Sequence, residues 1–228
     1  MYVPPAFRVD RATCLAFTAA RGFGLACAYD GDKPIASPVP FHIEYGSDGT
    51  PLLCFHLARH NPLIAHADGV TPWLFAVNEA DAYVSPDWYV SPDQVPTWLY
   101  RSVHMTGAVK IMTGQQLPDH LNQASARFEN DLAPKKPWTV DKMSPGRLEA
   151  MMKAIVGLVM TIEEVEGSFK LNQHKSDADH VAVTRALALQ TSAGAGILSD
   201  AMRAMRPQAF AAAKENEILS TVHEGIAL

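Results

Sequence analysis

The chain has 228 residues, 48% of them hydrophobic and 19% charged, which is enough to bury a sizeable core in one large or two small domains. Its formal net charge of −5 lacks the basic excess of a nucleic-acid-binding protein, and no apolar run is long enough to predict a membrane-spanning helix. The three cysteines are far apart and form no CxxC pair, so we expect reduced thiols in a cytoplasmic protein.

The first two thirds of the chain is predicted to be mostly β-strand, because short apolar runs alternate with turn signals. Prolines at 34, 38 and 40 place one strand at an edge or a bulge, and Gly107 indicates a bulge in another. Six short strands favour a barrel or sandwich over a βαβ sheet. They are Gly22–Tyr29, Ile35–Glu44, Leu52–Leu57, Trp73–Val77, Ala82–Val84, which follows a turn at Asn78–Asp81, and Val103–Met112.

Capping signals predict where the helices begin. Asn61 followed by Pro62 opens a short helix that runs through Ala67. Ser176 and Asp179 resemble a capping box in front of an apolar run. The other predicted elements are helices over Leu117–Asn130, Ser144–Lys153 and Val181–Leu189, and a strand over Val156–Val165.

We expect residues 1–190 to form one domain and residues 191–228 to form a C-terminal appendage. Gly194 and Gly196 interrupt the chain there, before an Ala- and Met-rich stretch around Pro207. The appendage is predicted to be a helix packed on a partner or a partly disordered tail.

Motifs for metal binding and hydrolysis are weak. His56 and His60 have an i, i+4 spacing, but the run Leu52–Leu57 places His56 on a strand, so we expect no metal ligands there. No GxSxG elbow is present, and no residue emerges as a general acid, base or nucleophile. No helix-turn-helix is evident, so direct DNA binding is disfavoured.

The end of one strand suggests an anion site. Arg59 and Asn61 follow the strand and precede a helix N-terminus, where free N–H groups favour a phosphate. Arg59 adds a fork of donors suited to the same group. A solvated arginine beside an asparagine cap explains the same residues equally well.

The segment Tyr83–Tyr100 is rich in aromatic residues set among prolines and hydroxyls. Prolines fix extended or turning backbone, and aromatic rings add apolar area at low entropic cost. Such a wall suits a planar ring system. The alternative is a proline-rich loop whose aromatic residues cap the core. An anion site for a phosphate, together with an aromatic site for a flat ring, would suit flavin mononucleotide (FMN).

Eight short motifs recur in order between Met1 and Leu189. They are Met1–Pro4 with Phe7, His56–Arg59 with Asn61-Pro62, Tyr83–Pro86 with Trp88-Tyr89, Val95–Trp98 with Tyr100, His104 with Gly107, Pro137-Trp138, Ile155–Gly157, and Lys170-Leu171 with Gln173 and Asp179. In this combination the chain resembles the PaiB-type FMN-binding negative transcriptional regulators, which are similar to the pyridoxamine phosphate oxidase group.

The resemblance implies a split β-barrel, and with the helices predicted above we expect a mainly β (α+β) fold: an FMN-binding split β-barrel with peripheral helices and a C-terminal helical appendage. It also implies a homodimer with FMN, or a similar flat ligand, at the dimer interface. In this arrangement Ser37, Arg59 and Asn61 hold the phosphate, and His104, Lys170 and Gln173 approach from the partner subunit. The full cofactor-binding set is Ser37, His56, Arg59, Asn61, Tyr83, Ser85, Trp88, Tyr89, His104, Lys170 and Gln173.

Three departures from the family pattern alter polar groups that would face a flavin. Pro38 stands where the family has histidine, Leu99 where it has asparagine, and His174 where it has asparagine. The chain therefore binds FMN, another flat ligand or none. Two other functions stay open: a flavin-dependent oxidoreductase acting on a small molecule, in which the flavin carries the redox chemistry, and a DNA-binding repressor without bound flavin.

Overall fold

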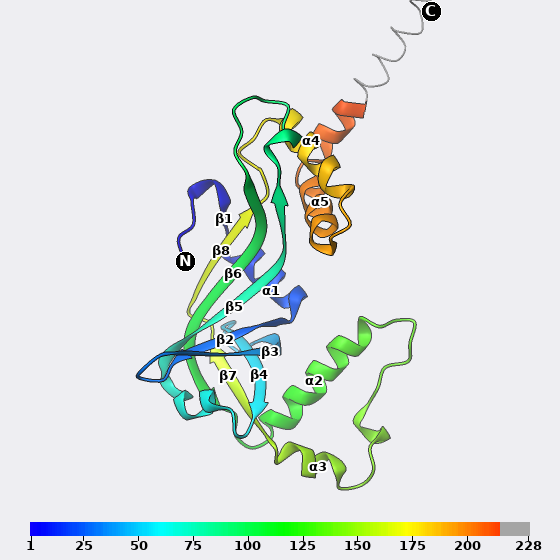
Figure 1. Ribbon diagram of the computed structural model, residues 1–228. Helices are drawn as coiled ribbons and strands as arrows, with labels where there is room; N and C mark the ends of the chain where they lie inside the picture. Colours follow the sequence, from blue (N-terminus) through cyan, green and yellow to red (C-terminus); the bar gives the residue numbers. More distant parts are fainter. Residues whose placement is uncertain (215–228) are drawn as a thin grey trace, which may run out of the picture. The chain divides into compact units, whose positions relative to one another are not determined.

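The protein is shown in Figure 1 as a computed structural model, which describes residues 1–214. Eight strands form one sheet in the order β1-β8-β6-β5-β2-β3-β4-β7. Because β7 also pairs with β6, the strands β6, β5, β2, β3, β4 and β7 close into a ring. The strands are β1 (Arg8–Val9), β2 (Phe23–Tyr29), β3 (Pro34–Tyr45), β4 (Pro51–Ala58), β5 (Asp68–Val84), β6 (Thr97–Ile111), β7 (Ile155–Thr161) and β8 (Glu164–Lys170).

Helices make up much of the rest of the described chain. The α-helices are α1 (Arg11–Arg21), α2 (Gln116–Asn130), α3 (Arg147–Met152), α4 (Asp177–Ala188) and α5 (Ala193–Met205), and the 3₁₀ turns are η1 (Pro5–Phe7), η2 (Pro62–His66), η3 (Pro86–Trp88) and η4 (Val140–Lys142). The predicted fold class, a mainly β split barrel with peripheral helices, is confirmed. Within residues 1–214, no helix is both long and apolar enough to cross a membrane.

Contacts divide the chain into two compact units. The barrel unit comprises Asp10–Val77 and Val103–Glu166. The helical unit comprises Met1–Val9, Asn78–Ser102 and the chain from Gly167 onward. The sequence-based boundary at residue 190 stays a prediction, and residues 215–228 of the expected appendage lie outside the described residues.

The barrel unit has an aromatic core. Phe41 on β3, Phe55 on β4 and Phe75 on β5 are fully buried and pack edge to face, with ring centroids 4.9 and 5.7 Å apart. Gly107 lies where a Cβ atom would sit 1.8 Å from the carbonyl oxygen of Thr161. Only glycine allows β6 to approach the end of β7 this closely.

In the helical unit, α4 packs against α5 and against η3. Ser176 caps α4 by accepting a hydrogen bond from the amide of Asp179, as the capping pattern predicted. The Asp179 carboxylate in turn accepts bonds from the amides of Val90 and Ser91, both at 2.9 Å, and from the Ser91 hydroxyl at 2.7 Å. These bonds attach the loop after η3 to the start of α4.

Four sequence-based boundaries are wrong. The predicted turn at Asn78–Asp81 is part of β5. The polar side chains of Asn78 and Glu79 have partners on the neighbouring strand β6. Ser102 donates a hydrogen bond to Asn78 at 2.6 Å, and Arg101 forms an ion pair with Glu79. The predicted strand Val156–Val165 is instead two strands, β7 and β8, on either side of a short turn.

The helix predicted from Ser144 begins at Arg147, after Gly146 at a φ of 74°. The glycines that appeared to interrupt the chain belong to α5. A Cβ atom on Gly194 would lie 2.4 Å from the carbonyl oxygen of Asp81, so glycine lets α5 approach β5. Helix α1, for which the sequence analysis assigns no element, begins at the Asp10 cap and ends at Gly22.

Candidate functional site

In the barrel unit, the structure brings together two of the residues predicted to hold a phosphate. Asn61 caps η2, because its Oδ1 accepts a hydrogen bond from the amide of Leu63 at 3.0 Å. Its Nδ2 donates to Ser37 Oγ on β3 at 3.2 Å. The predicted N-cap is confirmed, and the two polar side chains form one small polar site at the start of η2.

Arg59 has partners that the sequence did not predict. Its Nε donates to the carbonyl of Lys153 at 2.6 Å, and its Nη2 donates to the carbonyl of Ile155 at 2.9 Å. The guanidinium therefore ties the end of β4 to the start of β7. The side chain remains exposed, so a phosphate role stays a prediction alongside this structural one.

The two predicted histidines of the barrel unit differ in their surroundings. His56 Nδ1 lies 3.0 Å from His120 Nε2, and burial lowers the pKa of both rings, that of His120 to about 3 with His42 and His56 as neighbours. His104 on β6 is half-buried, and burial lowers its pKa as well. All three rings are held neutral at neutral pH.

In the helical unit, an aromatic groove forms where the sequence predicts a wall. Tyr83 on β5 and Trp98 on β6 meet edge to face, with centroids 6.0 Å apart at 71°. Their side chains are 45% and 54% exposed. Trp88 from η3 and the α4–α5 link complete a groove of about 430 Å³. It is lined by Asp81, Ala82, Tyr83, Trp88, Trp98, Gln190, Thr191, Ser192 and Ala195. We call it the aromatic groove.

Two other residues of the predicted ring slot lie outside the lining of this groove. Ser85 accepts a hydrogen bond from the amide of Asp87 and caps η3. Tyr89 donates its hydroxyl to Asn172 Oδ1 at 3.3 Å, and the ammonium of Lys175 lies 5.2 Å from the centroid of its ring. In this conformation both side chains support the loop, and their roles toward a ligand stay predictions.

Lys170 and Gln173 both form contacts with other residues of the helical unit. The Lys170 ammonium donates to Thr97 Oγ1 and lies 5.8 Å from the centroid of the Phe7 ring. Gln173 accepts from the amide of Leu171 at 2.7 Å and donates to the carbonyl of Phe169. The adjacent Asn172 is buried at a φ of 56°, and its Nδ2 has no hydrogen-bond partner.

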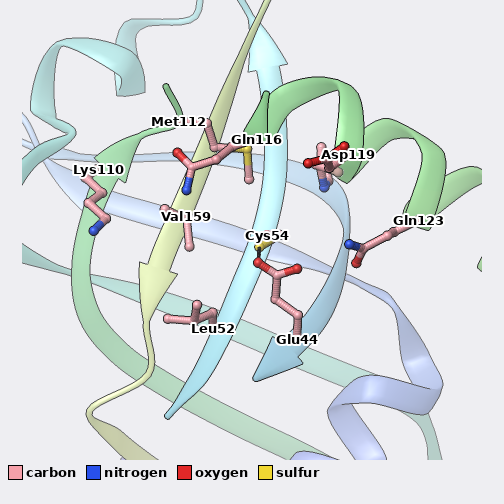
Figure 2. A pocket seen from close by; sticks show the side chains of 10 residues that line it. Glu44, Leu52, Cys54, Lys110, Met112, Gln116, Asp119, Gln123 and Val159 are labelled. Atoms are coloured by element: carbon pink, nitrogen blue, oxygen red, sulfur yellow. Dashed lines mark hydrogen bonds between the residues drawn. The ribbon is translucent and has the colours of Figure 1, made fainter. Parts of the chain in front are cut away.

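A second cluster escaped the sequence analysis. His42 and Glu44 alternate along β3, and Cys54 lies opposite His42 on β4. Figure 2 shows the Glu44 carboxylate beside Cys54 in a pocket that helix α2 covers. The alternation of His42 and Glu44 was the available signal, but Cys54 joins them only through the pairing of β3 with β4.

The family profile described as "Putative FMN-binding domain" matches residues 1–164 of the chain. The "Protease synthase and sporulation protein PAI 2" of Bacillus subtilis is 29% identical over 203 residues, which cover 89% of this chain and 96% of that protein.

Two solved structures are similar in fold. A conserved hypothetical protein of Mycobacterium tuberculosis has a TM-score of 0.52 at 12% identity, covering 77% of this chain and 94% of that one. An FAD- and heme-binding protein of Mycobacterium smegmatis has a TM-score of 0.50 at 16% identity, covering 71% of each chain. At these identities the likeness establishes the fold alone.

Proposed function

The chain belongs to the family of putative FMN-binding domains, and from that premise we propose that it binds FMN and acts as a regulator of the PaiB type. The observation that carries the flavin assignment is the aromatic groove. Its volume of about 430 Å³ lies within the roughly 300–1,000 Å³ of small-molecule sites. Two tryptophans and a tyrosine on its walls suit a flat, polarisable ring system.

Independently of the groove, the barrel unit has polar residues whose groups fit a phosphate. Ser37 offers a hydroxyl, Asn61 caps the N-terminal end of η2, and Arg59 provides an exposed cation. When bound, FMN supplies redox chemistry and a visible absorbance, while the chain's own residues bind and orient it. No catalytic residue is assigned.

We also propose that the protein is a homodimer with the flavin at the interface. The support comes from one face of the barrel unit. On β2, Phe23, Leu25 and Tyr29 are 45%, 39% and 59% exposed. The register places them opposite exposed prolines of β3, at positions 40, 38 and 34. This apolar face is of the kind that a second copy of the chain would cover.

The regulatory role rests on the resemblance to PaiB-type proteins and on the similarity to a Bacillus protein whose name connects it with protease synthesis and sporulation. The net charge of −5 favours regulation without direct contact to DNA phosphates. In this proposal the bound flavin or its ligand controls a protein partner or a small molecule.

Titration of the flavin-free protein with FMN, followed by flavin fluorescence, tests the groove. Trp98→Ala should weaken FMN binding by up to about tenfold, because it removes one aromatic wall. Tyr45→Ala is the matched control, since Tyr45 is 63% exposed on β3 and lies outside the groove. Equal affinities for wild type and Trp98→Ala would contradict the groove as the flavin site. Oxidation of NADH by the loaded protein would instead favour an oxidoreductase.

Light scattering tests the dimer. A stable interface should bury more than the roughly 800 Å² of crystal contacts. Leu25→Glu places a charge in the β2 face and should yield a monomer. Val70→Glu, at a position on β5 that is 78% exposed, should leave the dimer unchanged. A monomeric wild type would remove the basis for an interfacial flavin.

A further inference from the structure

The His42, Glu44 and Cys54 side chains converge inside the barrel unit. Residues two apart on a strand share a face, so His42 and Glu44 project to the same side of β3. Cys54 Sγ lies 3.2 Å from Glu44 Oε1, and His42 Nε2 lies 3.9 Å from Glu44 Oε2. One donor atom from each of the three residues falls within 4.8 Å of the others.

His42 supplies a second, independent observation. Its side chain is buried, at 5% exposure, yet neither ring nitrogen has a hydrogen-bond partner. Leaving such a group unpaired in a protein interior costs free energy. The contact between the Cys54 thiol and Glu44 accounts for those two residues, whereas the polar neighbours of His42, which are Glu44 at 3.9 Å and Gln123, do not meet hydrogen-bond geometry with its ring nitrogens. A bound cation would satisfy all three.

A stacked ring from α2 orients His42. The His120 ring from α2 stacks on His42, with centroids 4.9 Å apart and planes 17° apart. His120 is itself held by His56 through the 3.0 Å contact between their nitrogens. The imidazole of His42 is thus oriented before any ion binds. In metal sites, side chains that contact a ligand residue but not the metal have this orienting role.

We propose that His42, Glu44 and Cys54 form a binding site for a divalent transition metal, with Zn²⁺ as the ion. Imidazole nitrogen, thiolate sulfur and carboxylate oxygen are the ligands that zinc takes, whereas magnesium and calcium prefer oxygen alone. When the ion binds, the zinc–sulfur bond forms as the S–H bond breaks, and the thiol proton leaves to solvent.

The site has room for a further ligand. A pocket of about 170 Å³ is lined by Glu44 and Cys54, and also by Gln116, Asp119 and Gln123 of α2. Figure 2 shows these α2 side chains around the same pocket as the Glu44 carboxylate and Cys54. Three protein ligands with an open fourth position facing a cavity is the arrangement of zinc sites that bind water or a small molecule.

Cobalt substitution tests the ligands directly. Co²⁺ added to the metal-free, full-length protein should produce a sulfur-to-cobalt charge-transfer band, read as a difference spectrum so that flavin absorbance cancels. The band should be lost in Cys54→Ser and kept in Cys27→Ser. Cys27 is the matched control, because it is half-buried on β2 of the same unit and lies outside the cluster. A missing band in wild type, or a band that survives in Cys54→Ser, would overturn the proposal.

Zinc affinity, measured against a chromogenic chelator, tests the other two ligands. His42→Gln should weaken Zn²⁺ binding by about 100-fold or more, and Glu44→Gln by about tenfold or more. The Glu44 side chain is 39% exposed, so this variant is expected to fold even if the buried variants do not. Zinc should raise the melting temperature of wild type and much less that of Glu44→Gln. Equal affinity in all variants would show that zinc binds elsewhere.

Discussion

The aromatic groove of the helical unit and the His42–Glu44–Cys54 cluster of the barrel unit are built in opposite ways. The groove is made largely of exposed side chains, and its aromatic residues lie close in sequence on strand ends and a loop, while the α4–α5 link completes it. The cluster consists of three side chains on two paired strands, and two of them are almost fully buried. A site on loops needs buried supports to keep its shape, whereas a site on paired strands is positioned by their register.

Leu99→Asn is the strongest way to break the groove. Leu99 is fully buried next to Trp98, so the family's asparagine at this position would place an unpaired amide in an apolar site. We expect a loss of about 3 kcal/mol in the free energy of unfolding, measured by urea denaturation.

Pro38→His, the other family reversion, provides the control. Pro38 is exposed within one subunit but lies on the proposed dimer face, so the comparison is made in the monomeric Leu25→Glu background, where the change should alter the free energy of unfolding by less than about 0.5 kcal/mol. If Leu99→Asn proved as mild as Pro38→His, the wall of the groove would not depend on its buried neighbour.

Asp179→Ala should loosen the loop that carries η3 and Trp88. It removes the acceptor of three part-buried hydrogen bonds, two from the amides of Val90 and Ser91 and one from the Ser91 hydroxyl, at a cost of about 2 kcal/mol. Amide hydrogen exchange at Val90 and Ser91 should become faster, with little change at the β3–β4 pairs of the barrel unit. Uniform acceleration in both units would contradict a local support.

Lowering the pH should also weaken the hydrogen bonds by which the Asp179 carboxylate holds the loop after η3. Burial alone would raise the pKa of Asp179, but hydrogen bonds from Ser91, Ser176 and Val90 outweigh it and hold the pKa below its usual value. The carboxylate therefore contributes stability that is fully present above about pH 4, the unfolded value. That stability is lost as the pH falls through the lower folded value. Asp179→Ala should flatten this part of the stability–pH curve.

Arg59→Ala should have a smaller effect on stability than Leu99→Asn or Asp179→Ala. The side chain is exposed and donates to two carbonyls of the α3–β7 connection, so its loss should cost about 1 kcal/mol. If it also holds the FMN phosphate, affinity should fall by about one to two orders of magnitude. Arg59→Lys would separate the roles, because lysine keeps the charge without the fork. Unchanged FMN affinity in Arg59→Ala would leave only the structural role.

The amino-acid sequence by itself determined the features that depend on neighbours along the chain. Alternating apolar residues and turn signals predicted the barrel class, and the Asn61 and Ser176 caps formed as expected, because each cap bonds an amide two or three residues away. The aromatic residues of the groove were evident for the same reason: their density lies within one segment.

Only the tertiary structure decided the features that join distant residues. The acceptors of Arg59 are 94 and 96 residues away, and Asn78 and Glu79 stay in a strand because β6 supplies partners 24 and 22 residues later. Cys54 meets His42 through strand register, and His120 stacks on His42 from a helix far along the chain. Such contacts follow from which strands pair and in which register. Local patterns of hydrophobicity and capping do not determine strand pairing or register.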